Sequence, residues 1–184
     1  MKDSMTHNPG TVYLVGAGPG DPELITIKGL RCLEAADVIV HDRLIDKRLL
    51  TRARSDAELI DVGKIPGESQ ILQTEINSLL VSKAKNGTRV VRLKGGDPFI
   101  FGRGGEEAEA LVESQVPFEI VPGISSAMAA PAYAGIPLTH RGLASYFTVV
   151  TGSEAPNKKA STIAWDVIAR MEGTLVVLMG WDNL

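Results

Sequence analysis

Short runs of β-branched and other apolar residues alternate along this chain with segments of helical periodicity. Five such runs predict strands, at Val12 to Val15, Val38 to His41, Leu59 to Val62, Val90 to Leu93 and Phe118 to Val121. Leucine and isoleucine recur at near-helical spacing between them, at Leu24, Ile27, Leu30 and Leu33, and again at Leu72, Ile76, Leu79 and Leu80. Asn86-Gly87 ends the second periodic segment. The alternation predicts an α/β domain built around a mainly parallel sheet.

A second set of elements follows the turn Gly135-Ile136-Pro137. Its pattern predicts a strand from Tyr146 to Val150, a helix near Ile163 to Met171 and a strand from Thr174 to Met179. We therefore expect an N-terminal α/β domain over residues 11–136 and the start of a second α/β domain over residues 137–184. The second stretch is shorter than the roughly 50 residues of a small independent domain. Two strands and one helix cannot cover their own apolar faces, so we expect this domain to be incomplete in the chain.

Composition and charge exclude several classes of function. The chain has 184 residues, of which 44% are hydrophobic, and its formal net charge of −3 offers no basic field for nucleic acid. It contains no run of about 18 apolar residues, so we expect no membrane partner. The single cysteine, Cys32, makes a disulfide or a cysteine-based metal site unavailable, and no metal is expected. The segment from Met1 to Gly10 is polar, and the expected location is cytoplasmic.

Glycine-rich or polar segments follow each of the five predicted strands. They are Gly16 to Asp21, Asp42-Arg43-Leu44, Gly63-Lys64, Lys94 to Glu106 and Pro122 to Ser126. The fourth segment holds five glycines, which let a ligand approach the main chain closely. Because the carboxyl ends of parallel strands form one edge of a sheet, these segments predict a small-molecule site at that edge.

The first segment only partly matches a dinucleotide-binding fingerprint. Gly16 and Gly18 follow a strand and Asp42 ends the next, but Asp21 stands at the position of the third glycine. Pro19 also removes a backbone donor from the turn that would hold a pyrophosphate. No Gly-Lys-Ser/Thr follows either glycine-rich loop, which excludes a P-loop. The loops instead favour a ligand that is not a phosphate, such as an amino-acid-bearing nucleoside with a cationic centre beside Asp97, Phe99 and Ile100.

Taken together, these motifs resemble the uroporphyrinogen-III C-methyltransferase family of the tetrapyrrole and corrin methyltransferase superfamily. The similar segments are Gly16 to Pro22, His41 to Leu44, Val62 to Lys64, Arg92 to Gly104, Val121 to Ala127 and Gly135 to Arg141, in the same order and with compatible spacings. The resemblance implies a two-domain tetrapyrrole methyltransferase fold that binds S-adenosyl-L-methionine between the domains and releases S-adenosyl-L-homocysteine. It also implies a homodimer.

The resemblance assigns roles to individual residues. Cofactor contacts fall on Pro19, Gly95, Gly96, Asp97, Ile100, Ser125, Ser126 and Met179. Asp42 would accept a proton and Lys64 would donate one. Residue pattern alone would instead make Asp42 a helix N-cap and Lys64 a solvated loop cation.

The expected substrate, a tetrapyrrole, carries many carboxylates, which arginine binds in bidentate fashion. Arg103 and Arg141 are the leading candidates for binding them, and Arg43 is a third. Glu106 follows Arg103 by three residues and would share a helical face with it, so that it could orient this arginine or contact pyrrole N–H groups.

We therefore expect an S-adenosyl-L-methionine-dependent enzyme that transfers two methyl groups to uroporphyrinogen III and gives precorrin-2, on the way to sirohaem or cobalamin. Two alternatives stay open at this point. One is a methyltransferase that acts on a later precorrin or cobalt-precorrin intermediate. The other is a catalytically silent ligand-binding module.

Overall fold

The structure is a computed structural model that describes residues 10–63, 72–154 and 161–181. Its contacts divide the chain into two units, Met1–Ser125 and Ser126–Leu184. This division lies ahead of the Gly135-Ile136-Pro137 turn, where the sequence pattern places the boundary, because the helix before that turn groups with the second unit. Within the described residues, no helix has the length and apolar character needed to cross a membrane.

The first unit contains a five-stranded sheet in the order β3-β2-β4-β1-β5, and every neighbouring pair is parallel. Its strands are β1 (Val12–Gly16), β2 (Val38–His41), β3 (Glu58–Asp61), β4 (Val90–Lys94) and β5 (Phe118–Val121). The parallel sheet expected from the sequence is therefore confirmed. β4 occupies the centre of the sheet, between β2 and β1, and all of its residues are buried.

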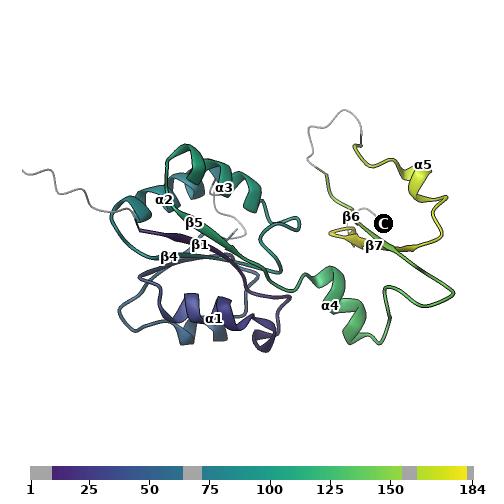
Figure 1. The fold of residues 1–184 in the computed structure, drawn as a ribbon, viewed down its shortest axis with the longest axis horizontal. Coiled ribbons are helices and arrows are strands. Elements are labelled where there is room, and N and C mark those ends of the chain that lie inside the picture. Colours follow the sequence, from purple (N-terminus) through teal and green to yellow (C-terminus); the bar gives the residue numbers. More distant parts are fainter. Residues whose placement is uncertain (1–9, 64–71, 155–160, 182–184) are drawn as a thin grey trace, which may run out of the picture. The chain divides into compact units, whose positions relative to one another are not determined.

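Helices cover both faces of this sheet, as Figure 1 shows, with α1 on one side and α2 and α3 on the other. The elements are η1 (Pro22–Leu24), α1 (Ile27–Glu34), η2 (Lys47–Arg52), α2 (Gln73–Lys85) and α3 (Gly104–Glu113). Alternate residues of β4 enter different cores: Val90 packs with Leu80 of α2 and Leu111 of α3, while Val91 packs with Leu33 of α1. Because side chains along a strand alternate between the two faces of the sheet, every second residue of β4 lies on the same face as Val90.

The helix boundaries have local causes. α1 begins after Thr26, whose hydroxyl accepts a hydrogen bond from the backbone N–H of Gly29 at 3.0 Å, and Leu24 belongs to the separate turn η1. α2 ends just before Asn86 and Gly87, and Gly87 has a φ of 82°. The sequence pattern therefore located the end of α2 correctly, because a glycine with positive φ stops a helix.

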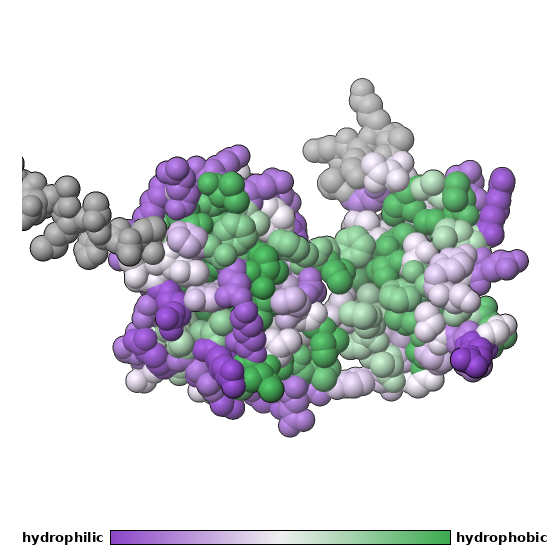
Figure 2. Space-filling model, viewed as in Figure 1, coloured by the Kyte–Doolittle hydropathy of each residue, from purple (hydrophilic) through white to green (hydrophobic). Residues whose placement is uncertain are grey.

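The second unit consists of α4 (Ser126–Tyr133), β6 (Phe147–Thr151), α5 (Trp165–Ile168) and β7 (Thr174–Leu178). β6 and β7 form a parallel pair. The helix expected from Ile163 to Met171 is only the four residues of α5. Val150 is the one buried residue of the two strands, and large apolar side chains such as Trp165 and Leu175 are exposed. Figure 2 shows the corresponding hydrophobic areas around β6, β7 and α5.

Candidate functional site

The loops after β1, β4 and β5 are joined at the carboxyl edge of the sheet. The backbone N–H of Gly18 donates to the carbonyl of Gly96 at 3.2 Å, and the N–H of Gly96 donates to the carbonyl of Gly18 at 2.7 Å. A Cβ atom on Gly16 would lie 2.5 Å from the Cα of Gly123, so this approach requires glycine. β1 leads into α1 on one face and β4 leads into α3 on the other. The joined loops therefore lie between two neighbouring strands whose following helices pack on opposite faces of the sheet. Open α/β sheets bind ligands at such a point.

Asp97 fixes the shape of this edge. Its Oδ1 accepts a hydrogen bond from the N–H of Phe99 at 2.8 Å, and its Oδ2 accepts one from the N–H of Gly123 at 3.0 Å. The carboxylate thus links the loop after β4 to the loop after β5. The cofactor contact expected at Asp97 stays a prediction, and the role that the structure shows for this residue is to hold the backbone of the two loops.

The two glycines beside Asp97 place no side chain between the main chain and a ligand. A Cβ atom on Gly95 would meet only Leu44, at 3.8 Å, and Gly96 has a φ of 67°. The main chain is therefore open to close approach there, as a ligand bound through backbone groups requires. Ile100, 41% exposed, adds an apolar surface nearby in the chain. These features fit S-adenosyl-L-methionine, which combines a flat aromatic base with polar and charged groups.

The remaining predicted cofactor contacts divide between the two units. Pro19 and Ser125 lie in the first unit, at the ends of the loops that follow β1 and β5. Ser126 begins α4, and Met179 directly follows β7, so both belong to the second unit.

Strained backbone accompanies several of these segments. Phe101, Arg103 and Met179 have φ values of 51°, 58° and 55°, in the left-handed region that residues other than glycine rarely adopt. Among the described residues, only Gln115 shares this property outside glycine. Strain of this kind concentrates at functional sites, which supports the interpretation of the loop after β4 and of Met179 as ligand-binding segments.

A buried group of charges lies directly beneath the strand ends. Arg92 and Lys94, on β4, are each 2% exposed, and Glu107, on α3, is fully buried. Glu107 Oε1 accepts hydrogen bonds from Arg92 Nε at 2.9 Å and from Lys94 Nζ at 3.0 Å. Arg92 Nη2 also donates to Asp42 Oδ1 at 2.5 Å. Two buried cations thus face one buried and one partly exposed carboxylate, and their formal charges cancel.

Burial sets the protonation behaviour of this group. Removal from water lowers the pKa of the Lys94 ammonium, and the neighbouring Arg92 charge adds to the effect, while Glu107 and Asp42 oppose it. Glu107 Oε1 accepts a third hydrogen bond from Gln73 of α2 at 3.3 Å. Its Oε2 is buried and has no hydrogen-bond partner among the described residues.

Asp42 lies immediately after β2, and its backbone N–H donates to the carbonyl of Leu93 at 3.1 Å. Asp46, and not Asp42, caps the following helix η2. The N-cap reading of Asp42 is therefore wrong, and its carboxylate is held instead by Arg92. Lys64, the predicted proton donor, lies outside the described residues.

The predicted substrate arginines are all exposed. Arg103 forms a bidentate ion pair with Glu106, at 2.8 Å and 2.7 Å. The expected pairing is present, but the two residues do not share a helical face, because Arg103 is the N-cap of α3 with a φ of 58° and lies ahead of the helix. These hydrogen bonds raise the pKa of Arg103 and lower that of Glu106, so both groups stay charged at neutral pH. Arg43 follows Asp42 in the first unit, and Arg141 lies in the second unit.

Sequence reasoning missed Arg92, Lys94 and Glu107. A signal was present: Arg92 and Lys94 alternate with apolar residues in a strand otherwise typical of a sheet centre, where charges need partners. Glu107 follows Gly104 by three residues and precedes Leu111 by four, on the face of α3 that packs against the sheet.

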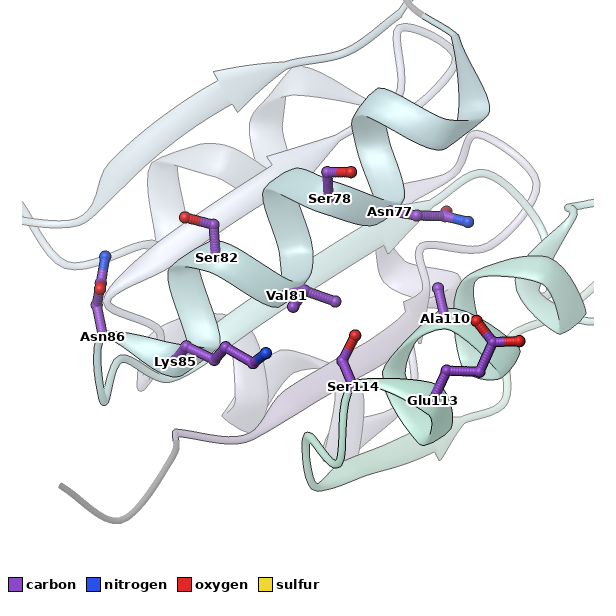
Figure 3. Close-up of a pocket in the computed structure, with 9 residues that line it drawn as sticks. All are labelled: Asn77, Ser78, Val81, Ser82, Lys85, Asn86, Ala110, Glu113 and Ser114. Atoms are coloured by element: carbon purple, nitrogen blue, oxygen red, sulfur yellow. The ribbon is translucent and has the colours of Figure 1, made fainter. Parts of the chain in front are cut away.

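A separate groove of about 460 Å³ lies between α2 and α3 (Figure 3). Residues with polar side chains outnumber apolar residues along it, and the lining consists of Asn77, Ser78, Val81, Ser82, Lys85, Asn86, Ala110, Glu113 and Ser114. These residues come from the middle and the C-terminal ends of the two helices, which run antiparallel to the strands, so the groove extends toward the amino edge of the sheet. It contains none of the predicted site residues.

Comparisons with known proteins agree with this geometry. The family model for tetrapyrrole (corrin/porphyrin) methylases matches residues 11–184. An S-adenosyl-L-methionine-dependent uroporphyrinogen III methyltransferase of Methanosarcina barkeri is 56% identical over 96% of this chain and 69% of its own length.

Two solved structures extend the comparison. A uroporphyrin-III C-methyltransferase from Thermus thermophilus, complexed with S-adenyl homocysteine, is 46% identical with a TM-score of 0.76, covering 95% of this chain and 68% of its own. A cobalt precorrin-4 methyltransferase is 30% identical with a TM-score of 0.81, covering 94% of this chain and 70% of its own. The parallel sheet, the joined strand-end loops and these similarities lead to one conclusion: the chain belongs to the tetrapyrrole (corrin/porphyrin) methylase family.

Proposed function

We propose that this chain catalyses the S-adenosyl-L-methionine-dependent methylation of uroporphyrinogen III, with two methyl transfers. The observation that carries the proposal is a difference in sequence identity: two solved relatives of similar fold are not equally identical to this chain. The uroporphyrin-III enzyme is 46% identical to this chain and the cobalt precorrin-4 enzyme 30%. This difference favours the early substrate over a later corrin intermediate.

Bound S-adenosyl-L-methionine supplies a methyl group on a positively charged sulfur, and transfer to a pyrrole carbon breaks the carbon–sulfur bond, whose electron pair stays on sulfur. The residues of this chain have two tasks in that reaction. The open backbone at Gly95 and Gly96, fixed by Asp97, holds and orients the donor. The Asp42 carboxylate accepts the proton that the macrocycle loses, which offsets the methyl cation that it gains. A proton that Lys64 donates to one carbon of the macrocycle is offset by a second proton lost from another, so that this exchange changes only the tautomer.

A direct assay tests the function. We expect the protein, incubated anaerobically with S-adenosyl-L-methionine and uroporphyrinogen III, to give a product heavier by two methyl groups, as measured by mass spectrometry. A mass gain seen only with a later precorrin or cobalt-precorrin would show that the substrate is wrong. Donor binding by calorimetry without any mass gain would indicate a silent ligand-binding module.

Arg103→Ala should weaken substrate binding and leave donor binding intact. Arg103 carries a guanidinium that remains exposed beside the strained loop, and losing one charge-assisted contact to a substrate carboxylate corresponds to a KM increase of about 10- to 100-fold. The dissociation constant of S-adenosyl-L-homocysteine, measured by calorimetry, should change less than about twofold.

Arg54→Ala is a matched control for this variant. Arg54 is also exposed and forms a bidentate pair with a nearby carboxylate, that of Asp56, but it contacts Asp37 at the amino edge of the sheet. We expect the KM of Arg54→Ala for the tetrapyrrole substrate to match that of the wild type. Loss of donor affinity in Arg103→Ala would show that the loop after β4 has been misassigned.

A further inference from the structure

Arg92 connects a fully buried carboxylate to the predicted proton acceptor. We infer that Arg92, anchored by Glu107, is a positioning residue that holds the Asp42 carboxylate in its working orientation. This inference rests on the proposed function, because it assigns Arg92 an effect on turnover through Asp42. It concerns a residue whose side chain is 3% exposed.

The anchoring of Arg92 leaves its guanidinium little freedom. The side chain rises from the central strand β4, and its Nε donates to Glu107 Oε1 at 2.9 Å. Its Nη1 lies 3.4 Å from the carbonyl of Leu93 and 3.5 Å from that of Val40. Because the guanidinium is planar, bonds on one side fix the direction in which Nη2 points. That direction is toward Asp42 Oδ1, at 2.5 Å.

Asp42 has the complementary properties. Its backbone is tied to the end of β4 by the hydrogen bond to Leu93, so its Cα position is fixed by the sheet. Its side chain is 32% exposed, which leaves the carboxylate accessible to a ligand at the strand ends. The side-chain torsion is thus the main remaining freedom, and the hydrogen bond from Arg92 restricts it.

Lys94 provides an internal comparison. It is as buried as Arg92 and bonds the same Glu107 oxygen, at 3.0 Å. Its hydrogen bond goes to Glu107, whereas the hydrogen bond to Asp42 comes from Arg92. A general disturbance of the buried charges would follow the loss of either cation, but a loss of Asp42 positioning would follow only the loss of Arg92.

The test is a double-mutant cycle on turnover with Arg92→Gln and Asp42→Asn. We expect Arg92→Gln to lower kcat about 100-fold, the effect of misplacing a reacting group by about 1 Å, while KM and S-adenosyl-L-homocysteine affinity stay within about twofold. The double variant should have a kcat within about threefold of that of Asp42→Asn alone, because both changes remove the same function. Lys94→Met should keep kcat within about threefold of the wild type.

The outcomes separate the two hypotheses. If Asp42→Asn turns over at the wild-type rate, the proton-acceptor assignment fails and this inference fails with it. If Asp42→Asn is impaired but the two effects multiply, or Lys94→Met matches Arg92→Gln, the positioning role is overturned while the proposed function stands. Should Arg92→Gln not fold, Arg92→Lys keeps a cation beside Glu107 but replaces the planar guanidinium, whose separate Nε and Nη2 atoms bond Glu107 and Asp42, with a single rotating ammonium. Wild-type kcat in folded Arg92→Lys would equally overturn the inference.

Discussion

Replacing Glu107 with glutamine is expected to lower the free energy of unfolding of the first unit by about 3–5 kcal/mol. Glu107 is fully buried and is the acceptor for two cations that are each 2% exposed. Glutamine preserves the volume and can still offer an oxygen, but it removes the negative charge that offsets Arg92 and Lys94. Two buried cations would then face only the partly exposed Asp42, and the desolvation of charge would no longer be compensated.

Urea unfolding followed by far-UV circular dichroism measures this effect. Among the described residues, the tryptophans Trp165 and Trp181 lie in the second unit, so their fluorescence would not follow the sheet of the first. Glu109→Gln is the matched control, because Glu109 is exposed on the same helix and should change the free energy by less than about 0.5 kcal/mol. A loss below about 1 kcal/mol in Glu107→Gln would show that the buried cations do not depend on this carboxylate.

Much of the first unit follows from the periodicity of its sequence. The run from Val38 to His41 coincides with β2, because buried parallel strands are almost continuously apolar. The run from Phe118 to Val121 coincides with β5, an edge strand that is mostly half-buried and includes Glu119. Once the strands are parallel, their carboxyl ends lie at one edge. The segments that follow them could therefore be assigned to one site before the strand order was known.

Other features depend on contacts that the sequence pattern does not contain. α3 begins in a glycine-rich stretch and α4 contains Pro131, so both lack the usual signals of a helix. The pairing of Arg92 with Glu107 depends on α3 covering the same face of β4 that Val90 occupies. The hydrogen bond from the N–H of Gly123 to Asp97 depends on the strand order that brings β5 beside β1, whereas the bond from Phe99 is local to the loop after β4.

Asp42→Asn is expected to lower kcat by about 100- to 10,000-fold, the usual contribution of a positioned acid or base. Asparagine keeps an oxygen that can accept the hydrogen bond from Arg92, so the local geometry is retained. The amide cannot take up the proton that the macrocycle loses after methyl transfer. The expected defect is therefore in turnover, and the affinity for S-adenosyl-L-homocysteine should stay within about twofold of the wild type. Initial rates of S-adenosyl-L-homocysteine formation and the mass of the tetrapyrrole product measure both quantities.

Asp46→Asn is the control that separates this role from a general effect of acidic residues near β2. Asp46 lies four positions further along, also bonds an arginine, Arg48, and caps η2, so its loss should affect stability and leave kcat within about threefold of the wild type. A folded Asp42→Asn enzyme with kcat close to that of the wild type would mean that another group or water accepts the proton. The ion pair with Arg92 would then serve only to join β2 to β4 and α3.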